Sequence, residues 1–158
     1  MQLMSVRRSE AEKVFIVVQA TDVAAEIQSG GLYPGQVVEW VTTTTASLQG
    51  YRVEKVDGVY TRTQGIAGKV AGVVDTTIAT GAVGRLQVYG PANVRASASY
   101  DAPSALVTSS INATNIGHVT NLLVTDTLGS VAQLGAFVGW SLEAGPNATN
   151  ATVHLSLL

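Results

Sequence analysis

The feature that most constrains the fold is a series of short apolar segments with no long segment of helical periodicity between them. Val14 to Val18 is β-branched and aromatic, which is typical of a buried strand. Arg85 to Tyr89 alternates, so that Leu86 and Val88 should face inward while Gln87 and both ends of the segment face outward. Short strands separated by glycines predict an all-β fold, either a small β-barrel or a sandwich.

Two dipeptides predict turns between these strands. Pro34 and Gly35 should turn the chain into a strand over Gln36 to Thr42. Asp57 and Gly58 separate Arg52 to Val56 from Val59 to Thr63, and an Asp-Gly pair suits a type I′ hairpin because both central residues need positive φ.

The distribution of charge divides the chain into three parts. Residues 1–13 carry much of the charge without apolar periodicity, so we expect an N-terminal extended arm. Residues 14–101 form the predicted β domain. Residues 102–158 contain only two charged residues and either complete that domain or form a second small one. Strands are expected there at Val119 to Thr125, Val131 to Val138 and Thr152 to Leu158.

The low charge indicates that partners cover much of the surface. The 158 residues include 9 Lys and Arg against 11 Asp and Glu, for a net charge of −2, and the mean hydropathy is +0.27. A chain with so few charges is poorly protected against self-association, so we expect a homo-oligomer. Nine dispersed cations form no basic stripe, so no nucleic-acid partner is expected. The apolar segment near the start is too short for a membrane span, so no membrane partner is expected either.

An internal similarity appears at an offset of 67 residues. Gly72 and Gly139 each follow an apolar segment, and Leu86 and Val88 correspond to Val153 and Leu155 at the same offset. Two explanations stay open, chance among short β segments and duplication, and the first is slightly favoured.

Residues suited to catalysis are sparse and scattered. His118 and His154 lie far apart without carboxylates at ligand spacing, and the absence of cysteine removes thiolate chemistry. Ser141, His154 and Glu143 could be combined on paper, but Ser141 lacks a nucleophile-elbow motif. We therefore predict a protein that is not an enzyme and has no cofactor or metal site, and we expect His154 to point off a strand face.

Aromatic residues are the best candidates for contacts with a partner, since they bury large areas with few rotatable bonds. The alternative is that both tryptophans are ordinary core residues, which is the commoner situation. The candidate partner-binding residues are Arg7, Arg8, Trp40, Tyr89, Tyr100 and Trp140.

Four segments together resemble a known group of proteins. Gly30 to Trp40 reads GGLYPGQVVEW and Ala71 to Val94 reads AGVVDTTIATGAVGRLQVYGPANV. With Gly135 to Ala144 and Ala151 to Leu158, they resemble the small capsid decoration, or cement, proteins of tailed bacteriophages. The resemblance implies a β-barrel or a β-tulip-like sandwich, often trimeric, on the outer capsid surface where major capsid proteins meet. It also implies an N-terminal arm that orders on the shell.

These observations lead to one expected function and two alternatives. We expect a virion protein that stabilises the capsid by bridging major capsid protein subunits through many modest contacts. The first alternative is a carbohydrate- or receptor-binding β module of a phage tail or fibre. The second, a hydrolase, is disfavoured because no nucleophile and base converge.

Overall fold

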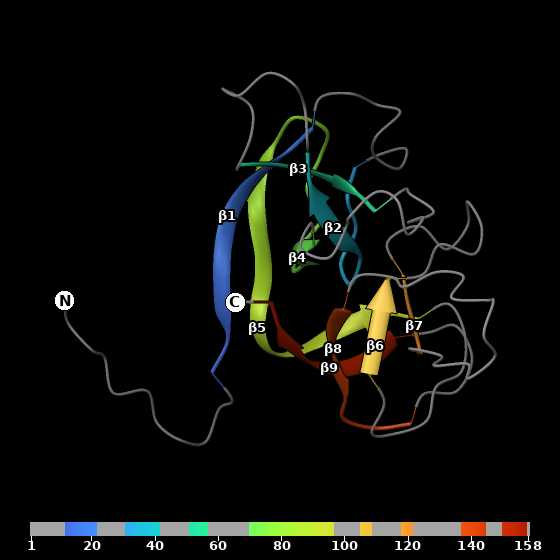
Figure 1. Ribbon diagram of the computed structural model, residues 1–158. Coiled ribbons are helices and arrows are strands. Elements are labelled where there is room, and N and C mark those ends of the chain that lie inside the picture. Colours follow the sequence, from blue (N-terminus) through green and yellow to red (C-terminus); the bar gives the residue numbers. More distant parts are fainter. Residues whose placement is uncertain are drawn as a thin grey trace.

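The computed structural model describes residues 12–21, 31–41, 51–56, 70–96, 105–108, 118–121, 137–144 and 150–157. These ranges contain strands and no helix, which confirms the predicted all-β class (Figure 1). The strands form one sheet in the order β1-β3-β2-β4-β5-β9-β8-β6-β7. Their bounds are β1 Val14–Ala20, β2 Val37–Trp40, β3 Arg52–Lys55, β4 Val70–Val74, β5 Val83–Arg95, β6 Ala105–Thr108, β7 Val119–Asn121, β8 Phe137–Ser141 and β9 Asn150–Ser156.

The first five strands in this order close into a barrel, which we call the first ring. Closure comes from β1, which pairs with β3 on one side and with β5 on the other. The β1–β3 pair is parallel and the remaining pairs are antiparallel, so the barrel is mixed. The turn predicted at Pro34 and Gly35 is confirmed, because Gly35 has a φ of 80° and its N–H donates to the Val74 carbonyl.

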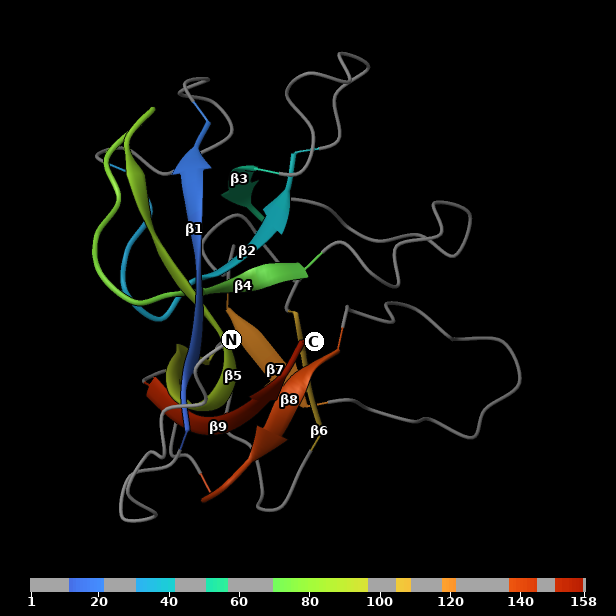
Figure 2. The ribbon, with the colours of Figure 1, turned by 90° about the vertical axis from the view of Figure 1, so that its left-hand side faces the viewer.

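The long strand β5 carries the chain out of the first ring into a second group of strands. Its first half pairs with β1 and β4, whereas Tyr89 to Arg95 pairs with β9. Gly90 lies at the change of partner with a φ of 88°, and a Cβ there would overlap the Glu12 carbonyl oxygen. Strands β9, β8, β6 and β7 follow, and a parallel bridge between Ala96 and Val119 returns to the end of β5. We call these strands, with the second half of β5, the second ring; it lies below the first in Figure 2.

The second ring repeats the strand order of the first. The second half of β5 takes the place of β1, and β6, β7, β8 and β9 take the places of β2, β3, β4 and β5. Strands β4 and β8 begin 137 − 70 = 67 residues apart, and β5 and β9 begin 150 − 83 = 67 residues apart. Each ring has its parallel contact at the same place, between β1 and β3 in the first and between Ala96 and β7 in the second.

The pairing register repeats as well. Val38 lies opposite Gly72 in the first ring and Leu106 opposite Gly139 in the second, and a register irregularity follows each pair. Both glycines pack too closely for a side chain: a Cβ on Gly72 would lie 2.9 Å from the Leu86 Cβ, and one on Gly139 would overlap the His154 carbonyl. The 67-residue similarity therefore corresponds to a repeated strand arrangement in the structure.

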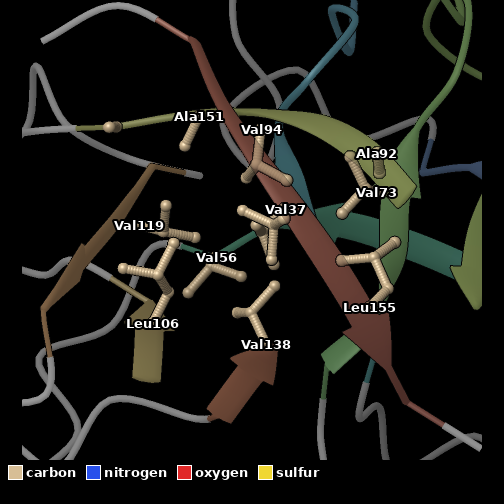
Figure 3. Packing of buried hydrophobic residues seen from close by; sticks show 12 residues of the cluster. Val37, Val56, Val73, Ala92, Val94, Leu106, Val119, Val138, Ala151 and Leu155 are labelled. Carbon is tan, nitrogen blue, oxygen red and sulfur yellow. The ribbon is translucent and has the colours of Figure 1, made fainter. Parts of the chain in front are cut away.

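Two apolar clusters fill the rings, and one of them crosses between the rings. The first cluster lies inside the first ring and includes Val18, Val53 and Leu86. The second combines second-ring side chains such as Leu106, Val138 and Leu155 with Val37, Val56 and Val73, which come from the first ring (Figure 3). The first ring therefore closes the core of the second.

The structure corrects three details of the predicted strands. Strand β1, predicted to be buried, has one exposed face that carries Phe15 and Val17. Strand β5 runs from Val83 to Arg95 and extends well beyond Tyr89. Gln87, predicted to face outward, points away from the first-ring core but is buried against the second half of β5. Its Nε2 donates to the carbonyls of Tyr89 at 3.1 Å and Pro91 at 2.8 Å.

Several predicted features lie outside the described residues. These are residues 1–11 of the arm, the Asp57–Gly58 turn with Val59 to Thr63, and the first six residues of the strand expected at Val131 to Val138.

Candidate interaction surface

One row of side chains crosses the outer face of the second ring from strand to strand. Pro91 on β5 lies opposite His154 on β9, His154 opposite Trp140 on β8, and Trp140 opposite Ala105 on β6. The neighbours of His154 along β9, Val153 and Leu155, are fully buried, so the alternation places the imidazole on the outer face, as predicted. We call Pro91, His154, Trp140 and Ala105 the outer row.

Aromatic and apolar side chains surround the outer row. The Tyr89 ring lies 5.3 Å from the His154 ring in an edge-to-face arrangement with an interplanar angle of 80°. Trp140 is 52% exposed, and Leu142 two residues further along is 55% exposed. Glu143 follows and accepts a hydrogen bond from the Thr152 hydroxyl. Two large apolar side chains, Trp140 and Leu142, are thus exposed beside one acidic residue.

The duplicated fold supplies an internal comparison for this row. The equivalent row of the first ring consists of Phe15, Gln87, Val73 and Val37, in the same cross-strand order. Val37 and Val73 are 0% and 2% exposed because the second ring packs over them. The position equivalent to Trp140 in the first ring is therefore already a contact between rings.

A second apolar surface lies on the outer face of β1 and β5 in the first ring, and we call it the β1/β5 face. Val17 and Val83 are 69% and 67% exposed, and Phe15 is partly exposed beside them. The Arg85 guanidinium lies 5.2 Å from the centre of the Phe15 ring and forms an ion pair of 2.8 Å with Asp75. The β1/β5 face thus combines three apolar side chains with an arginine.

The structure separates the six candidate partner-binding residues. Trp140 and Tyr89 lie on and beside the outer row, where His154 connects them. Trp40 is half-buried and packs against the core of the first ring, in agreement with the ordinary core interpretation for that residue. Arg7, Arg8 and Tyr100 lie outside the described residues.

The sequence reasoning did not select Phe15, Val17, Val83 or Leu142. The signal was available for Phe15 and Val17, since in an alternating strand they occupy the face opposite Ile16 and Val18. Because β1 was interpreted as a buried strand, that alternation was overlooked.

The groups considered for catalysis lie apart. Ser141 is buried on the inner side of β8, whereas His154 points outward from β9. His118 is half-buried, and its pKa is lowered first by burial and then by the positive charge of Arg95. Its Nδ1 is buried and has no hydrogen-bond partner within the described part of the chain. In that part, no three His, Asp or Glu residues are grouped to hold a metal ion.

A small polar depression of about 250 Å³ lies where the two rings meet. Lys13, Asp75, Asn93 and Asn150 contribute to its walls. Its described lining residues include no aromatic side chain on which a sugar ring could stack. No helix among the described residues is long and apolar enough to cross a membrane.

Comparison with known proteins gives a fold relationship. No protein-family model matches the chain, and no curated protein matches it. Among solved structures, the chain is similar to the N base of the head fiber gp8.5 of bacteriophage phi29, with a TM-score of 0.53 and 9% sequence identity. The similarity covers 92% of this chain and 96% of the phage chain. It therefore extends over both rings.

Proposed function

We propose that the chain is a non-enzymatic structural protein of a phage head, which binds the outer capsid surface as a homotrimer and bridges major capsid protein subunits. The observation that carries this proposal is the fold similarity to the head fiber base, because it spans nearly the full length of both chains. The capsid-protein resemblance of Gly30 to Trp40 and Ala71 to Val94 supports the same location independently.

Sparse charge and exposed apolar side chains suit a protein that works between other molecules. Only 13% of residues are charged, and the outer row and the β1/β5 face expose large apolar side chains. Contacts of this type gain free energy from the burial of apolar surface. An oligomer that makes several such contacts at once dissociates far more slowly than a single subunit, because all contacts must break together.

Co-sedimentation with assembled capsids tests this proposal. The probe is capsids assembled from the major capsid protein of the phage that encodes this chain, purified without the chain itself. We expect saturable binding that fixes a constant ratio of chain to capsid protein, and weaker binding for a variant that lacks residues 1–11. A chain that stays in the supernatant at every capsid concentration would overturn the proposal. Binding to a glycan array without capsid binding would support the carbohydrate-binding alternative instead.

A further inference from the structure

We propose that copies of this chain join head to tail, with the outer row around Trp140 of one copy packed against the β1/β5 face of the next. The inference rests on the self-association in the proposed function and adds the two surfaces that make it. Four observations lead to it, and the first and third use the repeated ring as an internal reference.

First, the face of the first ring that is equivalent to the outer row is already a contact surface. Val37 and Val73 occupy the positions of Ala105 and Trp140 in the first ring, and they are buried in the cluster that joins the rings. In the first ring, this face is therefore a contact surface that closes the core of the second ring. In the second ring of a single chain, Trp140 and Leu142 remain exposed.

Second, the exposed face of the second ring carries residue types that dominate protein interfaces. Tryptophan, tyrosine and histidine rings lie next to one another in Trp140, His154 and Tyr89. Aromatic side chains near the centre of an interface contribute more binding free energy than their number suggests.

Third, the fold does not require apolar residues on the β1/β5 face. In the second ring, the positions of Val17 and Val83 are occupied by Asn93 and Asn150. Those asparagines are exposed and complete the same strand pairing. Since one ring folds with polar side chains there, the valines of the other ring need a different explanation, and contact with a partner provides it.

Fourth, the two surfaces come from different rings and present different side chains. Glu143 lies beside the outer row, whereas Arg85 lies on the β1/β5 face, where it forms an ion pair with Asp75. Because the two surfaces differ, their pairing is heterologous. Such a contact builds a closed ring when the rotation between copies closes, in agreement with a trimer.

Single-face variants test each surface. We expect Trp140→Glu and Val17→Glu each to convert the oligomer into a 16.3 kDa monomer in sedimentation velocity. Glutamate at position 17 would lie opposite Arg85, so the strand pairing should tolerate it. Asn93→Glu is the matched control, since it places the same charge at the equivalent position of the second ring and should leave the oligomer intact. If Trp140→Glu fails to fold, as judged by circular dichroism, Trp140→Thr replaces it.

Mixing the two monomeric variants tests the head-to-tail geometry. The Trp140→Glu copy keeps an intact β1/β5 face and the Val17→Glu copy keeps an intact outer row, so an equimolar mixture should form a dimer and stop there. A mixture that stays monomeric would overturn the head-to-tail pairing, as would variants that remain oligomeric. These outcomes are independent of capsid binding, so the failure of this inference is distinguishable from failure of the proposed function.

Discussion

At the scale of single residues, His118 links the folded state to pH. Burial and the charge of Arg95 lower its pKa below the ordinary value of 6.5, so the folded chain disfavours the protonated imidazole. Between the lowered pKa and 6.5, the unfolded chain binds more protons than the folded chain. The contribution of His118 to stability is therefore complete above pH 6.5 and is lost as the pH falls toward the lowered pKa.

The substitution His118→Gln should reduce this loss of stability on acidification. The measurement is the melting temperature of both proteins between about pH 5 and about pH 8, which brackets histidine titration. Above pH 6.5, we expect the two melting-temperature curves to differ only by a constant offset. Below pH 6.5, the melting temperature of the native chain should fall more steeply than that of His118→Gln. Parallel curves for His118→Gln and the native chain would contradict the assignment.

At the scale of elements, strand β5 shows which features the local sequence predicts and which it does not predict. The alternation of Leu86 and Val88 was predicted, and both residues are buried as expected. The extension to Arg95 was not predicted, because Gly90 and Pro91 are typical of a strand end. The strand continues past them because Gly90 adopts a positive φ and β9 supplies a new pairing partner, neither of which is a local property.

Gln87 stabilises β5 at this change of partner, since its buried amide donates to two carbonyls of the same strand. Gln87→Leu keeps the size of the side chain and removes the donor, so it should lower the free energy of unfolding by about 1–3 kcal/mol. The measurement is chemical denaturation. Gln19→Leu is the matched control, because the Gln19 amide donates to the Gly81 carbonyl at a half-buried site and water can replace it. Equal losses for the two variants would argue against a special role for Gln87.

At the scale of the whole molecule, part of the candidate surface could be predicted and part could not. Trp140 was selected from residue type, Tyr89 from residue type and its outward position in an alternating strand, and His154 was placed on an outer face by alternation. The comparison of these positions with their counterparts in the first ring needs the structure, because the 67-residue offset in the sequence gives only a faint signal of that relationship. Aligning residues 70–90 with 137–157 leaves Gly72 and Gly139 as the one identical pair, because inward positions need only be apolar while outward positions differ between rings.

The shared strand and shared core predict that the two rings unfold together. The rings have β5 in common, and Val73 of the first ring belongs to the core of the second. Each ring carries one tryptophan, so Trp140→Phe leaves Trp40 to report on the first ring and Trp40→Phe leaves Trp140 to report on the second. Denaturation of each variant is followed by tryptophan fluorescence and by circular dichroism. In both variants, the fluorescence transition should coincide with the circular dichroism transition of the same protein, because the two rings unfold together.

Adding Val73→Ala should shift both fluorescence transitions by the same amount, about 2 kcal/mol, since a buried methyl pair is lost from a core that both rings need. Val53→Ala, which removes the same atoms from the first-ring cluster, is the comparison. If Val73→Ala moved only the Trp140 transition, the rings would be independent folding units, and the joint core would contribute nothing to the first ring.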